Sequence, residues 1–150
     1  PLGRHPTDRK RMAVLAEGRP ARTDAWCVAR FQVADLLRLE LHSGRTHQIR
    51  VHLAHIGHPV VGDPVYGAGG SRRISGSARL IAEAVERAAG RQALHAASLA
   101  FKHPVTEAAL EFRSEWPADL RLALELAAGD SVSVAPGEAL RYLLFFNRDG

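Results

Sequence analysis

The segment from Gly44 to Gly67, GRTHQIRVHLAHIGHPVVGDPVYG, constrains the fold more strongly than any other part of the chain. Ser43 and Gly44 end a preceding strand, and Thr46 is a suitable N-cap for a helix. We expect this helix to run through residues 55 or 56 and to end at Gly57, because glycine is common just after the last helical turn. Residues 59–70 then read as a loop.

Ile49, Leu53 and Ile56 recur at steps of four and three along this predicted helix. This spacing predicts that they form its buried stripe. Arg50 lies away from the stripe, and an arginine held at the edge of a core usually pairs with a carboxylate. The residue type leaves two alternatives open. The pair either fixes the helix as a plain salt bridge or keeps a functional carboxylate ionised.

The rest of the chain predicts short strands and helices without a βαβ rhythm. We therefore expect an α+β fold with a mixed, mainly antiparallel sheet and flanking helices. Residues 1–25 read as a loop rich in proline, glycine and arginine. The predicted elements are an antiparallel hairpin of strands 26–33 and 37–41, a helix over 78–89, strands over 94–101 and 109–112, and a helix over 117–127.

The composition is that of a globular chain with a moderate excess of basic residues. The 150 residues are 46% hydrophobic, the formal net charge is +4 and the pI is near 10.0. This balance favours a nucleic-acid partner, although a solvated basic loop fits it as well. No apolar run approaches the length of a membrane span, so we expect no membrane contact. The single cysteine, Cys27, fits a reducing compartment, and we expect a cytoplasmic protein.

Three histidines, His52, His55 and His58, are spaced three residues apart and suggest a metal site at first sight. No carboxylate lies between residues 44 and 59, and two arginines in the same segment oppose a cation. Asp63 is the only carboxylate nearby. The sequence therefore predicts no metal site here.

An anion fits the same segment better. Arg45, Thr46, His47 and Gln48 are predicted to lie at or near the N-terminus of the helix, where free backbone N–H groups favour negative charge. Arg45 adds a charged, bidentate donor. A phosphate group or a nucleic acid is therefore the predicted ligand.

The whole segment resembles the third signature motif of the RluA-like pseudouridine synthases. Three other segments resemble motifs of the same family: RHPTDRKRMAV at 4–14, GRPART at 18–23, and LHA with the following L, F and HP at 94–104. The resemblance covers roughly residues 3 to 120. It implies that 1–127 is the C-terminal part of a synthase catalytic domain and that 128–150 is an extension of unknown role.

The resemblance implies isomerisation of uridine to pseudouridine in ribosomal or transfer RNA, without a metal or other cofactor. Arg50 is implied to pair with the catalytic aspartate. Leu94 is implied to lie against the target base, although core packing explains this leucine equally well. The implied RNA-binding residues are Arg4, His5, Arg9, Lys10, Arg45, Thr46, His47 and Gln48.

The chain departs from the family pattern at one decisive position. The family's aspartate lies in a motif like H-R-L-D-x-x-T-S-G upstream of the first matching loop, and none of the seven aspartates here has that context. Asp63 is expected to brace its own turn, and Tyr66 is assigned no catalytic role. We expect the C-terminal part of a synthase, inactive alone. The alternatives are a non-catalytic RNA-binding module and a basic structural domain without an RNA partner. The motifs do not define the oligomeric state.

Overall fold

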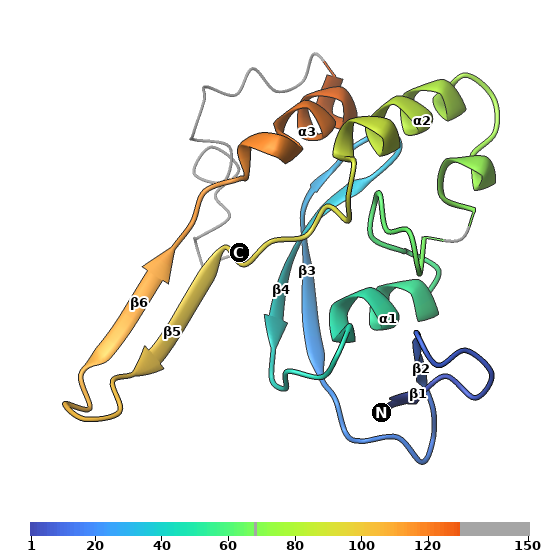
Figure 1. Cartoon of the computed structure of the whole chain (residues 1–150). Helices are drawn as coiled ribbons and strands as arrows, with labels where there is room; N and C mark the ends of the chain where they lie inside the picture. The colour runs from blue at the N-terminus through green and yellow to red at the C-terminus, as the bar shows by residue number, and fades with distance from the viewer. Residues whose placement is uncertain (68, 130–150) are drawn as a thin grey trace.

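The computed structural model of the chain describes residues 1–67 and 69–129 (Figure 1). These residues form six strands, three α-helices and two short 3-10 helices. In chain order they are β1 (Leu2–Arg4), β2 (Met12–Val14), β3 (Thr23–Arg30), β4 (Asp35–Leu41), α1 (Gln48–His55), η1 (Gly70–Arg73), α2 (Ala78–Ala89), β5 (Ser98–Lys102), β6 (Ala109–Arg113), η2 (Ala118–Leu120) and α3 (Arg121–Ala128).

The strands pair as three antiparallel hairpins, β1–β2, β3–β4 and β5–β6. This confirms the predicted α+β class and its antiparallel pairing, with the pairing divided over three two-stranded sheets. Figure 1 shows the long β3–β4 hairpin in the centre, with α2 and α3 side by side at one end and α1 alongside its other half. The β5–β6 hairpin extends away from the remaining elements.

The β3–β4 hairpin confirms the predicted pairing but places its turn earlier in the chain. The N–H of Phe31 donates to the carbonyl of Ala34 at 3.0 Å, so Val33 lies in the turn and not in a strand. Asp35, which was predicted to lie in the turn, pairs with Arg30 as the first residue of β4. We predicted a longer strand because Phe31 and Val33 are apolar. In the structure these two side chains lie in the turn region and pack against the α2–α3 core.

The prediction of a loop over residues 1–25 was wrong. The β1–β2 hairpin forms there, and β3 already begins at Thr23. Leu2 is only 2% exposed and belongs to a core cluster with Val51 of α1 and Tyr66. Strands of three residues are too short for an alternating pattern to be visible in the sequence, so tertiary packing and not local periodicity decides their formation.

Helix α1 ends as predicted but differs from the prediction at its start and on its buried face. Its N-cap is His47 rather than Thr46, and no side chain caps the helix. The predicted stripe is confirmed at Leu53, which is buried, but it was wrong at Ile56, which is 63% exposed. Gln48 and Val51, which lay outside the predicted stripe, are buried. Val51 packs against Leu2 and Tyr66, so α1 buries the face that carries Val51.

The C-terminal helices form the second core. Helix α2 has the predicted bounds, and α3 begins at Arg121 after the short η2 helix. The buried side chains at their interface are Val85, Ala89, Leu120, Ala123 and Ala127. No helix within 1–67 and 69–129 is long and apolar enough to cross a membrane. The VSV and YLLFF segments, and most of the predicted extension over 128–150, lie outside the described residues.

Two glycines offer a matched test of how the loop after α1 packs. Gly62 has φ +69°, and a Cβ atom there would collide with the carbonyl oxygen of Arg91. Gly90 has φ +63°, but a Cβ atom there would meet nothing within 4 Å. We predict that Gly90→Ala lowers the free energy of unfolding by about 1 kcal/mol, the cost of the left-handed backbone alone. Gly62→Ala adds the collision and costs about 2 kcal/mol more.

Urea unfolding of both variants measures this difference. Equal losses would contradict the close packing of residue 62 against the turn that follows α2.

Candidate functional site

A buried ion pair joins α1 to the loop that follows it. The Nε–H of Arg50 donates to Oδ2 of Asp63 and an Nη2–H donates to Oδ1, each at 2.7 Å. The Asp63 side chain is 0% exposed and that of Arg50 is 12% exposed. Because both donors meet both acceptors, the guanidinium plane has a fixed orientation.

The turn after Asp63 is built on the same carboxylate. Its Oδ1 also accepts hydrogen bonds from the N–H groups of Val65 at 2.9 Å and Tyr66 at 3.0 Å. This confirms that Asp63 braces its own turn. The carbonyl of Asp63 further accepts the N–H of Gly67 at 3.0 Å, so the loop from 63 to 67 closes on one residue.

Electrostatics keep both members of the pair charged. Burial alone would raise the pKa of Asp63, but the hydrogen bonds from Arg50, Tyr66 and Val65 and the charge of Arg50 hold it below its usual 3.8. The hydrogen bond with Asp63 raises the pKa of Arg50 above its ordinary value. The pair is therefore ionised at neutral pH.

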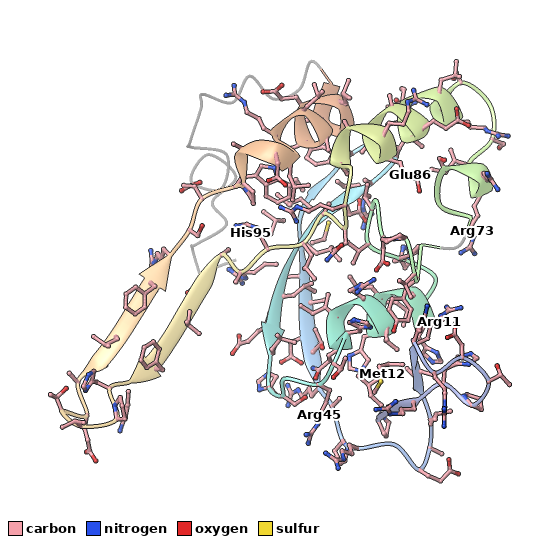
Figure 2. All side chains as sticks on the ribbon, in the orientation of Figure 1. Arg11, Met12, Arg45, Arg73, Glu86 and His95 are labelled. Carbon is pink, nitrogen blue, oxygen red and sulfur yellow. The ribbon has the colours of Figure 1, made fainter. Side chains whose placement is uncertain are left out.

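Tyr66 connects this pair to the first hairpin. Its phenol oxygen accepts the N–H of Met12 in β2 at 2.8 Å and lies 3.0 Å from Nδ1 of His47. The guanidinium carbons of Arg11 and Arg50 lie 5.3 and 5.0 Å from the centre of its ring. Figure 2 shows Arg11 and Met12 between the β1–β2 hairpin and α1. Tyr66 thus places cationic side chains of two distant segments around one ring.

The start of α1 is fixed by Gln48, which is 3% exposed. Its Nε2 donates to the carbonyl of Arg22 at 2.9 Å and to Oγ1 of Thr23 at 3.0 Å. Its Oε1 accepts the N–H of Arg45 at 3.1 Å and the hydroxyl of Ser43 at 2.8 Å. The amide of Gln48 therefore serves the fold, and a contact with RNA would require these bonds to break.

The other predicted RNA-binding residues lie on two segments, the β1–β2 hairpin and the loop before α1. The Leu2, Val51 and Tyr66 core joins the hairpin to α1 itself, and Figure 2 shows Arg45 in the loop before α1. The exposed members are Arg4, Arg9, Lys10, Arg45 and Thr46, and His47 is partly buried. His5 has a local role, because its Nδ1 accepts the N–H groups of Thr7 and Asp8.

Leu94 lies in the segment between α2 and β5, away from α1 in the sequence. The N–H of Ala93 donates to the carbonyl of Val61 at 2.8 Å, which joins this segment to the loop that carries Asp63. Leu94 is partly buried. Its placement agrees with a role near the site and equally with packing.

Sequence reasoning missed that Arg50 pairs with Asp63 and that Tyr66 joins the two basic segments. The sequence held a signal for the Arg50–Asp63 pair. Arg50 was expected to pair with a carboxylate, and Asp63 is the first carboxylate after the helix that carries Arg50. No local signal pointed to the Tyr66 contacts, since Met12 lies 54 residues away. Within the part of the chain that the structure describes, no group of three or more His, Cys, Asp or Glu could hold a metal ion.

Asp63→Asn tests whether the ion pair carries stability. Removing one charge leaves Arg50 buried without compensation, so we predict a loss of about 3 kcal/mol in the free energy of unfolding at neutral pH. The folded-state pKa of Asp63 is lower than its unfolded value of 3.8. Its ionisation therefore stabilises the fold above pH 3.8, and this contribution is lost as pH falls below that value.

The difference between the wild type and Asp63→Asn should consequently shrink in acid, as measured by urea unfolding across a pH series. Asp24→Asn is the matched control, because Asp24 forms a more exposed pair with Arg22. The contribution of a surface pair is small, so we expect a much smaller loss. Similar losses for the two variants would contradict a special role of the Arg50–Asp63 pair.

Comparison with known proteins identifies the family. Ribosomal large subunit pseudouridine synthase D of Escherichia coli K12 is 45% identical over 130 residues, which are 87% of this chain and 39% of that protein. The same-named protein of Haemophilus ducreyi is 48% identical over 79% of this chain and 36% of its own length. A protein of Chloroflexus aurantiacus named "Uncharacterized RNA pseudouridine synthase" is 46% identical over 83% of this chain and 35% of its own length.

The chain thus spans little more than a third of the length of these relatives. No family model matches it. The identity nevertheless extends over most of the chain. It confirms the resemblance found in the sequence, and the chain belongs to the RluA-like family of pseudouridine synthases.

Proposed function

We propose that the protein carrying this chain isomerises uridine to pseudouridine in ribosomal RNA, in the cytoplasm. The supporting observation is 45% identity over 87% of the chain to a protein named as a ribosomal large subunit pseudouridine synthase. Transfer RNA is the alternative substrate. The reaction breaks the bond from the ribose to N1 of uracil, joins the ribose to C5 and exchanges a hydrogen at C5 for one at N1. It is balanced without a cofactor, and we propose none.

Arg50 is proposed to hold the catalytic aspartate. Its Nε and Nη2 are bound to Asp63, whereas its Nη1 has no hydrogen-bond partner among residues 1–67 and 69–129. A second carboxylate can therefore bind at Nη1 without displacing the first. The positive charge of Arg50 would keep that carboxylate ionised. Asp63 itself cannot take the catalytic role, because it is fully buried and its oxygens are occupied.

The basic residues beside this site are proposed to bind the RNA backbone. Arg4, Arg9 and Lys10 are exposed on the first hairpin, and Arg45 and Thr46 are exposed before α1. Phosphate contacts of this kind release counterions, so RNA affinity should fall as salt is raised.

Leu94 is proposed to lie against the target base, which such enzymes must take out of its stack.

A second candidate function, RNA binding without chemistry, is favoured by one observation. Within the described residues, every aspartate already has a hydrogen-bond or ion-pair partner inside the chain. These partners are Lys10 N–H for Asp8, Arg22 and His42 for Asp24, Arg30 for Asp35, Arg50 for Asp63, and Arg91 for Asp119. The described part of the chain therefore offers RNA binding but no free carboxylate at Arg50.

The test uses the protein encoded by the complete gene and its Arg50→Ala variant. Pseudouridine formation removes hydrogen from C5, so release of tritium from C5-labelled uridine in large-subunit ribosomal RNA or transfer RNA measures activity. We predict activity in the wild type and a loss on the order of 100-fold or more in Arg50→Ala. RNA binding, measured on the folded fraction of the variant, should change by less than about threefold, because Arg50 binds carboxylates and the proposed phosphate contacts lie on other residues.

Arg79→Ala is the matched control, since Arg79 forms an exposed ion pair with Glu83 on α2 and should leave activity unchanged. RNA binding by the complete protein without tritium release from either RNA would favour the non-catalytic module. Activity of the 150-residue chain alone would contradict the need for an aspartate outside it.

A further inference from the structure

The phenol group of Tyr66 makes two hydrogen bonds whose directions can be assigned. The N–H of Met12 can only donate, so the phenol oxygen is the acceptor of that bond at 2.8 Å. The hydroxyl hydrogen is then left for the second partner, Nδ1 of His47, at 3.0 Å. In this arrangement Nδ1 accepts the hydroxyl hydrogen and carries no hydrogen of its own. A neutral imidazole in that state carries its hydrogen on Nε2.

The opposite arrangement is unfavourable. If Nδ1 carried a hydrogen, it would donate to a phenol oxygen that already accepts from Met12. The hydroxyl hydrogen of Tyr66 would then have no partner in a residue that is 5% exposed. An unpaired buried donor is costly, and this cost disfavours the Nδ1–H form. Tyr66 thus selects one tautomer of His47.

The backbone conformation and the ring orientation of His47 are also fixed by the structure. Its φ of 56° and ψ of 20° place a residue with a Cβ atom in the left-handed region, which is uncommon and costs free energy. The imidazole meets the Tyr66 ring edge-on, with centroids 5.6 Å apart and planes at 76°. These contacts offset the cost of the backbone conformation. Strain that packing maintains in this way is common at functional sites.

The second ring nitrogen of His47 faces away from Tyr66 and is open. Nε2 has no hydrogen-bond partner in the described residues, and it is not among their buried unpaired atoms. His47 is the N-cap of α1, next to the exposed Arg45 and Thr46. A helix N-terminus flanked by arginines favours an anionic acceptor. A phosphate oxygen of bound RNA meets this requirement.

We propose that Tyr66 is a positioning residue that locks His47 as the Nε2–H tautomer, so that this N–H donates to a phosphate oxygen of the RNA. The RNA contact rests on the proposed function, whereas the tautomer does not. Tyr66 acts through His47 and does not touch the RNA. The guanidinium groups of Arg11 and Arg50 also lie against the Tyr66 ring. Tyr66 therefore positions both the Nε2–H donor of His47 and these two cationic side chains.

The tautomer is tested by long-range ¹H–¹⁵N NMR on the ¹⁵N-labelled chain, above the pH at which imidazole titrates, about 6.5. We expect a single Nε2–H form for His47 in the wild type and a mixture of tautomers in Tyr66→Phe, which keeps the ring. His52 is the reference in the same spectra, because its Nδ1 faces Oγ1 of Thr23 and not Tyr66. Nδ1–H in the wild type would overturn the proposal even if the variant failed to fold.

The RNA contact is tested by fluorescence anisotropy with a uridine-rich single-stranded RNA oligonucleotide. We expect His47→Ala to weaken binding about fivefold, the effect of one hydrogen bond. Tyr66→Phe should weaken binding by about twofold, because a mixture of tautomers still supplies the Nε2–H donor in part. The double variant should bind no more weakly than His47→Ala, because Tyr66 acts through His47. Multiplied losses in the double variant would overturn the positioning role.

Failure of the wild-type chain to bind this RNA at low salt would overturn the proposed RNA contact, whereas the proposed function is decided separately by tritium release with the complete protein. The NMR result would still decide separately whether Tyr66 sets the tautomer.

Discussion

The bidentate ion pair between Arg50 and Asp63 is the interaction on which the rest of the site depends. It is buried, and burying two charges is favourable only when their remaining hydrogen-bonding groups are also satisfied. The structure meets this condition at Asp63 through the N–H groups of Val65 and Tyr66. The same carboxylate therefore orients the arginine and shapes the turn that presents Tyr66. A single residue couples helix α1 to the loop that follows it.

The Tyr66 contacts extend this coupling to the first hairpin. Met12 is the first residue of β2, Arg11 immediately precedes it, and His47 lies at the start of α1. All three contact the phenol group of Tyr66. Tyr66 thus links the first hairpin to the start of α1 and to Arg50. Under the proposed function, this arrangement would link RNA binding to the chemistry at the catalytic aspartate through one rigid support.

The sequence predicted much of the local structure but less of the packing. The β3–β4 hairpin and the bounds of α2 follow from alternation and helix periodicity, which are local properties. The β1–β2 hairpin and the buried face of α1 depend on Leu2 meeting Val51, a contact that no local pattern encodes. Arg50 was correctly expected to need a carboxylate. The described residues supply Asp63, which was not predicted as its partner, and the catalytic aspartate of the proposed function would take the remaining nitrogen.

The most direct test of this account is a double-mutant cycle with Arg50→Ala, Asp63→Ala and the double variant, measured as free energies of unfolding in urea. The cycle isolates the interaction between the two side chains from their other contacts. If the pair organises the site, the coupling free energy should be at least about 2 kcal/mol, with the double variant less impaired than the two single losses together. A coupling below about 0.5 kcal/mol, the limit for independent positions, would contradict the account.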